Sequence, residues 1–274
     1  MSLLELKELA FSYGEKQVFS HVNYALEPGQ LCCLMGPNGC GKSTLLDCIL
    51  GCLQPETGEV FLNGKNIRSY RPNELAKWMS YVPQVHDRTF PYTVRQIVEM
   101  GRTPYHKFYS GPDAEDQRLV TEALELAGIR HLADRPYTRI SGGEMQLALL
   151  ARAIVQDTPL ILMDEPTAHL DFRNELVFLQ MVSRLMEEKH TAVLLATHSP
   201  NHPFYFENLG RNVEVAAMGD KTLKMVGKPQ EVLTEENIQE IYGICARRMS
   251  CFDERGGTMT QIFPVCTCTE EKKL

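Results

Sequence analysis

A nine-residue loop, Gly36 to Thr44, constrains the fold of this 274-residue chain more than any other segment. Its sequence, GPNGCGKST, fits the phosphate-binding pattern G-x-x-x-x-G-K-[ST]. The apolar run Leu31–Met35 before it predicts a buried strand, and Leu45–Leu50 after it predicts a helix. Glycines let main-chain N–H groups approach an anion closely, and the start of a helix adds a positive dipole. The segment therefore predicts a loop that cradles phosphates.

Within this loop, Lys42 supplies a point charge to the outer phosphates and Ser43 supplies a hydroxyl to Mg²⁺. The predicted nucleotide-binding residues of the loop are Gly36, Pro37, Asn38, Gly39, Cys40, Gly41, Lys42, Ser43 and Thr44.

A second candidate element is the apolar strand 160–163, which ends in Asp164 and Glu165. The end of this strand is expected beside the phosphate loop, where Asp164 can reach Mg²⁺. Glu165 can then face the γ-phosphate and polarise a water, because phosphoryl transfer depends mostly on orientation and charge stabilisation.

A third element, Ser141-Gly142-Gly143-Glu144, precedes the helical run 145–156. A serine and two glycines at a helix start form an anion site without a lysine. Lys42 already serves one nucleotide, so this second motif is expected to bind the nucleotide of another subunit.

Strands and helices alternate along the chain, which predicts an α/β fold with a mainly parallel sheet. Residues 85–157 carry helical periodicity and are expected to form a helical insertion in one domain that spans residues 1–265. Residues 266–274 are expected to be a disordered tail. No run of about 20 apolar residues and no leader pattern is visible, so no membrane span is expected.

Composition excludes some functions. The net charge of −7 argues against a broad nucleic-acid surface, so no nucleic-acid partner is expected. Nine cysteines, an odd number, argue against a disulfide framework. Cys32 and Cys33 in the apolar strand are expected to be core residues, and no zinc or iron–sulfur site is predicted.

These motifs resemble those of the ATP-binding subunit of an ABC transporter. The loop 36–44 is similar to the Walker A motif, and the strand that ends in Asp164-Glu165 is similar to Walker B. Residues 141–144 are similar to the signature motif, whose usual Leu and Gln are replaced here by Ile140 and Glu144. The resemblance covers about residues 2–265. It implies a RecA-like core, a helical subdomain with the signature motif and an N-terminal antiparallel β region.

The resemblance also assigns smaller motifs. Gln84 is similar to the Q-loop glutamine that senses Mg²⁺ and water, and Asp171 to the D-loop. His198 is similar to the switch histidine at the γ-phosphate, and Tyr13 to an aromatic stacked on adenine. Glu165, His198, Lys42 and Gln84 are thus the implied catalytic set, and Ser43, Gln84 and Asp164 the implied Mg²⁺ ligands.

The stretch Met100–Tyr105 and the C-terminal Ile241-Tyr242-Gly243 resemble subunits that power import of iron–siderophore complexes, haem or vitamin B12. The implied partners are a second copy of the chain, which completes an ATP sandwich, membrane permease subunits and, indirectly, an external substrate-binding protein. The implied location is cytoplasmic, on the inner face of the membrane. The segment 85–109, with His86, Arg88, Phe90, Tyr92, Arg102, Tyr105 and His106, is expected to receive the permease.

Three alternatives remain open at this point. A molybdate or tungstate importer is similar enough to fit the same motifs. A soluble ABC ATPase acting on DNA or ribosomes usually carries a long coiled coil or two cassettes, which 274 residues do not accommodate. A small-molecule P-loop kinase would leave the motif at Ser141 and His198 unexplained.

Overall fold

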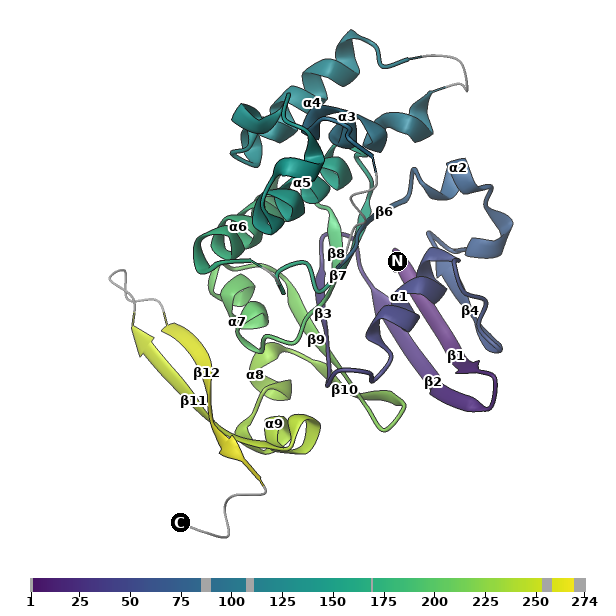
Figure 1. Cartoon of the computed structure of the whole chain (residues 1–274). Helices are drawn as coiled ribbons and strands as arrows, with labels where there is room; N and C mark the ends of the chain where they lie inside the picture. The colour runs from purple at the N-terminus through teal and green to yellow at the C-terminus, as the bar shows by residue number, and fades with distance from the viewer. Residues whose placement is uncertain (1, 85–89, 107–110, 169, 253–257, 269–274) are drawn as a thin grey trace. The chain divides into compact units, whose positions relative to one another are not determined.

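The computed structural model of the chain describes residues 2–84, 90–106, 111–168, 170–252 and 258–268 (Figure 1). Its contacts divide the chain into two compact units. The first unit comprises Met1–Ile67 and Leu194–Leu274, and the second comprises Arg68–Val193. The boundaries fall within the short 3-10 helix η1 (Ile67–Ser69) and within strand β8 (Ala192–Ala196).

The first unit contains an antiparallel sheet, a mainly parallel sheet, a hairpin and four helices. Its strands are β1 (Leu4–Tyr13), β2 (Lys16–Leu26), β3 (Leu31–Met35), β4 (Thr57–Leu62), β5 (Lys65–Asn66), β9 (Val213–Gly219), β10 (Thr222–Gly227), β11 (Ile244–Phe252) and β12 (Thr258–Thr267). Its helices are α1 (Lys42–Leu50), α7 (Asn201–Asn208), α8 (Pro229–Val232) and α9 (Glu235–Tyr242).

The antiparallel sheet has the order β2-β1-β4-β5, and in the second sheet β10, β9, β3 and β8 follow one another. Strand β3 pairs in parallel with β9, in the register Leu31↔Val213 to Met35↔Ala217. All five residues of β3 are buried, as expected for a strand covered on both faces. The antiparallel region confirms the prediction for the N-terminal part.

The second unit is mainly helical, with two parallel strands. Its strands are β6 (Met79–Val82) and β7 (Leu160–Asp164). Its helices are α2 (Pro72–Leu75), α3 (Val94–Glu99), the 3-10 helices η2 (Met100–Tyr105), η3 (Arg130–Leu132) and η4 (Tyr137–Arg139), α4 (Ala114–Leu126), α5 (Gly142–Val155) and α6 (Phe172–Lys189).

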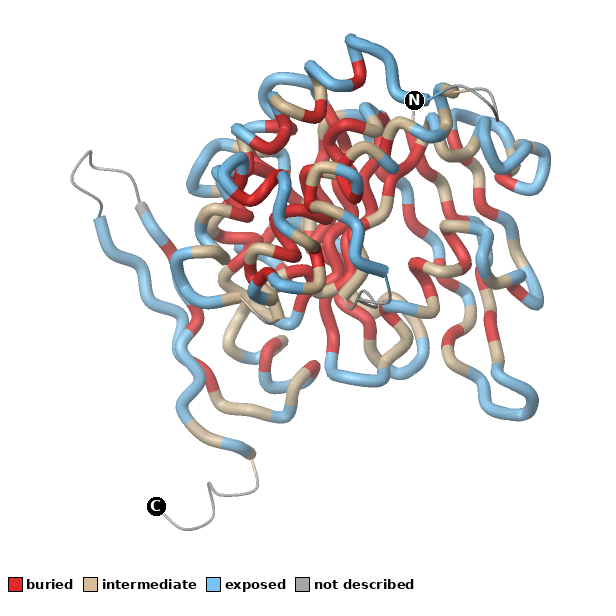
Figure 2. The backbone as a smooth tube through the Cα atoms, turned by 45° about the horizontal axis from the view of Figure 1, so that its top comes forward, coloured by how far each residue is buried: buried red, intermediate tan, exposed pale blue. Residues whose placement is uncertain are grey.

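Helix α5 is the centre of this unit, and it contacts α3, α4 and α6. Leu147 to Ala151 are all buried, and a helix that is apolar all round must be enclosed by other elements. Figure 2 draws buried stretches of the chain in red and exposed stretches in pale blue, and much of the hairpin near the C-terminus is pale blue. The core of the unit thus fixes the start of α5, where Ser141 stands.

One boundary differs from the expectations. Strand β12 continues through Cys266 to Thr267, so these two residues of the tail predicted for 266–274 are ordered, and residues 269–274 lie outside the described part. None of the nine cysteines, all of which are described, forms a disulfide. Among the described residues, no helix has the length and apolar character needed to cross a membrane.

Candidate functional site

The phosphate loop connects β3 to α1 in the first unit. Gly36 has φ +147°, and a Cβ there would lie 2.6 Å from the main-chain oxygen of Met218, so only glycine fits. Lys42 is buried, and its Nζ donates to the Gly36 carbonyl at 2.8 Å and to the Pro37 carbonyl at 3.4 Å. The loop therefore holds a cation at its centre while Asn38 stays exposed at its rim.

Tyr242, the last residue of α9, contacts this loop from the C-terminal part of the chain. The Gly36 N–H donates to the Tyr242 hydroxyl at 3.2 Å. Sequence reasoning noted Tyr242 only as part of a subgroup resemblance and assigned it no role. Its hydroxyl fixes the first glycine of the phosphate loop.

His198 follows β8, which neighbours β3 in the sheet. The Thr197 N–H donates to the Leu34 carbonyl at 3.0 Å, and the Thr197 hydroxyl hydrogen-bonds His202 Nδ1 at 2.8 Å. This buried anchor leaves the next residue, His198, exposed. His198 and the phosphate loop thus follow the carboxyl ends of neighbouring strands, where ligands of open α/β sheets bind.

Tyr13 ends β1 and is 56% exposed, so its ring is available as a stacking surface. It meets Phe11 edge-on, with the ring centroids 4.9 Å apart and an interplanar angle of 82°. This contact restricts the rotation of the Tyr13 ring.

In the second unit, Asp164 is the buried last residue of β7, and Glu165 follows it. Glu165 has φ +43°, an unfavourable backbone conformation for a residue with a side chain, and such strain concentrates at functional sites. Gln84 follows β6, which pairs in parallel with β7, and its Nε2 donates to Glu165 Oε2 at 3.2 Å. The structure therefore joins two of the predicted catalytic residues directly.

Ser141 is the N-cap of α5, and it forms a capping box with Glu144. Ser141 Oγ accepts from the Glu144 N–H at 3.2 Å, and Glu144 Oε2 accepts from the Ser141 N–H at 2.7 Å. The hydrogen bond from the Ser141 main chain is the largest cause of a lowered pKa for the Glu144 carboxyl. Glu144 is thus an ionised part of the helix cap, and the Ser141 hydroxyl proton can still point to an acceptor outside.

Asp171 is the N-cap of α6, where its Oδ1 accepts from the Asn174 N–H at 2.8 Å. Asn174 lies against the signature motif, since a Cβ on Gly143 would be 2.7 Å from Asn174 Nδ2. A cavity of about 250 Å³ beside these residues is lined in part by Ser141, Glu144 and Arg173. The signature and D-loop residues therefore form one cluster in the second unit.

The docking surface predicted for 85–109 is wrong for part of its residues. Arg102 Nε lies 2.8 Å from Asp116 Oδ1, and His106 Nε2 lies 2.6 Å from Asp116 Oδ2. Both side chains are largely buried, so they bind within the unit and are not a free surface. Tyr105 donates to the Gln156 carbonyl at 2.9 Å, and Arg102 lies over its ring. His86 and Arg88 lie outside the described residues.

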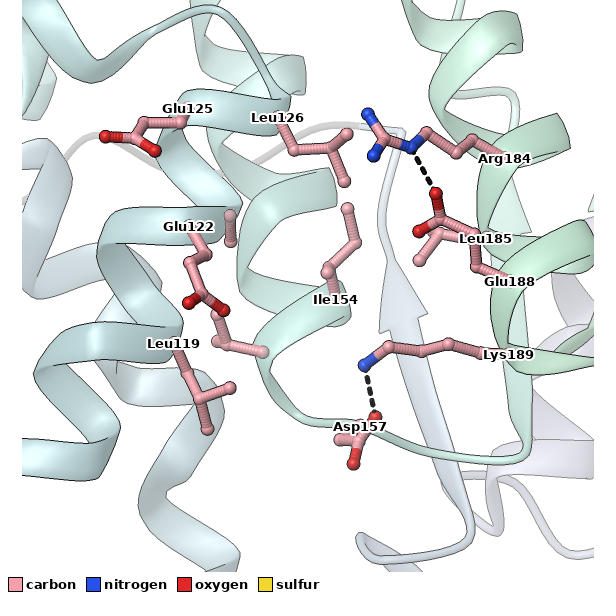
Figure 3. A pocket seen from close by; sticks show the side chains of 12 residues that line it. Leu119, Glu122, Glu125, Leu126, Ile154, Asp157, Arg184, Leu185, Glu188 and Lys189 are labelled. Carbon is pink, nitrogen blue, oxygen red and sulfur yellow. Dashed lines mark hydrogen bonds and ion pairs between the residues drawn. The ribbon is translucent and has the colours of Figure 1, made fainter.

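A larger cavity, of about 500 Å³, lies between α4 and α6 and carries ion pairs on its rim (Figure 3). Arg184 pairs with Glu188, and Lys189 pairs with Asp157. The residues of α5 and α6 that line it stand at the C-terminal ends of these helices. Ser141 and Asp171 cap the opposite ends, about 20 Å away at 1.5 Å per residue of α5. This cavity is therefore separate from the signature cluster.

A strand–phosphate loop–helix unit with a parallel sheet defines a P-loop NTPase. The family profile described as ABC transporter matches residues 19–168. The chain belongs to this family, and the fold class predicted from the sequence is confirmed. ATP-binding subunits of the family hydrolyse ATP to drive transport.

Individual relatives cover most of the chain. An ABC transporter ATP-binding protein of Haemophilus influenzae is 40% identical, over 88% of this chain and 89% of the relative. The iron(3+)-hydroxamate import ATP-binding protein FhuC of Bacillus subtilis is 33% identical over 90% of each. The molybdate import ATP-binding protein MolC of H. influenzae is also 33% identical, over 87% of each. A structure of a metal-chelate type ABC transporter in an inward-facing conformation superposes with a TM-score of 0.83, at 30% identity over 97% of this chain and 98% of that chain.

Proposed function

We propose that this chain is the ATP-hydrolysing subunit of a type II ABC importer for metal chelates, such as iron–siderophore complexes, haem or cobalamin. The observation that carries the cargo class is the near-complete superposition on the metal-chelate type transporter. The identity to an iron(3+)-hydroxamate import subunit supports the same class.

The residues of the phosphate loop fit ATP. The glycine cradle that a Cβ would fill at Gly36 brings main-chain N–H groups to the phosphates, and Lys42 compensates their charge. Ser43, Asp164 and Gln84 offer hydroxyl, carboxylate and amide oxygens, the donors that Mg²⁺ prefers. When bound, Mg²⁺ would neutralise charge on the phosphate oxygens. Tyr13 would stack on the adenine.

Two copies of the chain would share each nucleotide. The phosphate loop of one copy would face the Ser141-Gly142-Gly143 start of α5 of the other, since Ser141 retains a hydroxyl proton for a phosphate oxygen. Glu144 would stay ionised in the helix cap, and Asp171 would hold the neighbouring start of α6. Closure of the pair would then depend on two bound ATP molecules.

Glu165 would accept the proton of the attacking water, and Gln84 would orient the Glu165 carboxylate through the 3.2 Å hydrogen bond. His198 would contact the γ-phosphate from the end of β8, where the Thr197 anchor sets its position. Lys42 would stabilise charge on the transferred phosphoryl group.

The experiment that tests these roles separates binding from hydrolysis. Lys42→Ala should lose ATP affinity, because the phosphates lose their buried cation. Glu165→Gln should bind ATP with unchanged affinity and lose most turnover, because an amide is not a base. Fluorescent-nucleotide titration and phosphate release measure the two quantities. Turnover of Glu165→Gln at the parent rate would disprove the catalytic assignment.

The partners in this proposal are membrane permease subunits and, through them, an external binding protein. The chain would then lie on the inner face of the cell membrane. Among the described residues of the proposed contact segment, Phe90 and Tyr92 have exposed rings, with centroids 5.9 Å apart. Exposed aromatics are favoured interface anchors.

Co-purification of the chain with a permease encoded near it, followed by ATPase assays in liposomes, tests the cargo. A ferric siderophore with its binding protein should stimulate hydrolysis. Stimulation by molybdate instead would favour the MolC-like alternative. Stimulation by DNA or ribosomes in the absence of any permease would favour a soluble ABC ATPase.

A further inference from the structure

Gln146 is a buried amide in an otherwise apolar stretch of α5. It lies five residues after Ser141, and only 1% of its surface is exposed. The next seven residues are all buried or nearly so, and six of them are apolar. A polar side chain in this position requires a hydrogen-bond partner, because burying a polar group without one is costly.

Only one end of the Gln146 amide has such a partner among the described residues. Its Nε2 donates to the main-chain carbonyl of Gln84 at 2.9 Å. Its Oε1 is buried, and no described residue donates to it. An unsatisfied buried acceptor costs roughly 1–3 kcal/mol. An apolar residue of the same size would remove this cost but would also remove the donor to the Gln84 carbonyl, so we expect a small net effect on stability.

The contact at Gln84 leads on to the proposed base. Gln84 accepts from Gln146 through its main chain and donates to Glu165 Oε2 through its side chain at 3.2 Å. Two hydrogen bonds thus connect three elements of the second unit: the start of α5, the segment after β6 and the strained residue after β7.

We infer that Gln146 is a positioning residue for ATP hydrolysis. Its amide fixes the main chain of Gln84 so that the Gln84 side chain reaches Glu165. Gln146 and Ser141 both lie in the first turns of α5. Contact of Ser141 with a nucleotide bound to the partner copy would therefore also affect the position of the Glu165 carboxylate in this copy. The inference rests on the proposed roles of Gln84 and Glu165.

The test replaces Gln146 with methionine, which keeps the volume and removes both polar atoms. The full-length Gln146→Met variant should melt close to the temperature of the parent and bind ATP within about twofold. Its kcat should fall roughly tenfold with KM unchanged, the loss that corresponds to one hydrogen bond of about 1.4 kcal/mol in the transition state. Gln146→Leu, a second apolar replacement, should lower kcat by the same factor.

A matched control stands at the other end of α5. Gln156 donates its Nε2 to the carbonyls of Ala76 and Met79 at 2.6 and 3.1 Å, and neither of these carbonyls belongs to Gln84. Gln156→Met should lower the melting temperature and leave kcat unchanged. Gln146 and Gln156 should therefore show opposite effects on stability and turnover.

A double-mutant cycle identifies the route of the effect. In a Gln84→Ala background, Gln146→Met should cause no further fall in kcat, because the side chain that it positions is absent. Parent kcat in Gln146→Met, or equal losses with and without Gln84, would overturn the inference while the proposed function stands. Failure of both Gln146 variants to fold would also overturn it, since the role would then be structural. Parent turnover in Glu165→Gln and Gln84→Ala would instead refute the proposed function.

Discussion

Truncation of Asp116 is predicted to destabilise the helical unit strongly. Its carboxylate is 3% exposed and binds Arg102 at 2.8 Å, His106 at 2.6 Å and the N–H of Asp113 at 3.0 Å. Removing one partner of a buried pair costs about 3–5 kcal/mol, because the other charge remains buried. Arg102 keeps the Val155 carbonyl at 2.9 Å, so we expect the lower end, about 3 kcal/mol.

This cost corresponds to a fall of about 6–12 °C in the melting temperature of Asp116→Ala, at about 2–4 °C per kcal/mol for a chain of this size. Glu188→Ala is the control, because it breaks an ion pair whose side chains are 59% and 51% exposed. Exposed pairs contribute little, so we expect less than about 2 °C. Thermal melting by circular dichroism measures both. A fall for Asp116→Ala no larger than that of the control would refute the argument.

The pH dependence gives an independent check. Burial raises the pKa of the Asp116 carboxyl, but the hydrogen bonds from Arg102 and Asp113 and the charges of His106 and Arg102 outweigh it, so the pKa lies below its ordinary value. A lowered pKa means that the stabilisation is present above the ordinary value of about 4 and is lost as the pH falls through the lowered one. The gap in melting temperature between parent and Asp116→Ala should narrow below about pH 4.

Three further substitutions test the site. Tyr242→Phe removes the acceptor for the Gly36 N–H and should weaken ATP binding about 3- to 10-fold by nucleotide titration, and unchanged affinity would contradict a role in the phosphate loop. Gly143→Ala places a Cβ 2.7 Å from Asn174 Nδ2 and should reduce ATPase activity, whereas the double variant with Asn174→Ala should recover part of it; no recovery would contradict the steric explanation. Glu144→Ala removes a capping partner of α5 and should cost about 1 kcal/mol in urea unfolding, with the difference from the parent disappearing at acidic pH because the pKa of Glu144 is lowered.

Elements with strong local signals could be predicted from the sequence. Helix α6, Phe172–Lys189, is an example, because Asp171 caps its start and its apolar residues recur at helical spacing. The phosphate loop could be predicted because its glycines, lysine and serine all lie within nine consecutive residues. The roles proposed for Gln84, His198 and Tyr13 depend on a family resemblance, since each is a single residue without a local pattern.

The burial of Arg102 and His106 could not be predicted, because their residue types are common at surfaces. Both bind Asp116, and this carboxylate stands 14 residues after Arg102 on α4. A sequence shows that a cation and an acid exist, but the path of the chain between them decides whether they meet inside the unit. The segment after α3 is consequently held by contacts of Arg102 and His106 with Asp116 inside the unit, instead of offering both side chains to a partner.

Gln146 and Tyr242 were missed for a different reason. Each contacts a main-chain group, the Gln84 carbonyl 62 residues away and the Gly36 N–H 206 residues away. Every residue offers such groups, so no residue type marks the partner in the sequence. A buried amide within an apolar helix was nevertheless a readable signal, because such a side chain must bind something. In this chain both contacts end on Gln84 and Gly36, residues with a proposed catalytic or phosphate-binding role, so long-range contacts to the main chain position the segments that the local motifs mark.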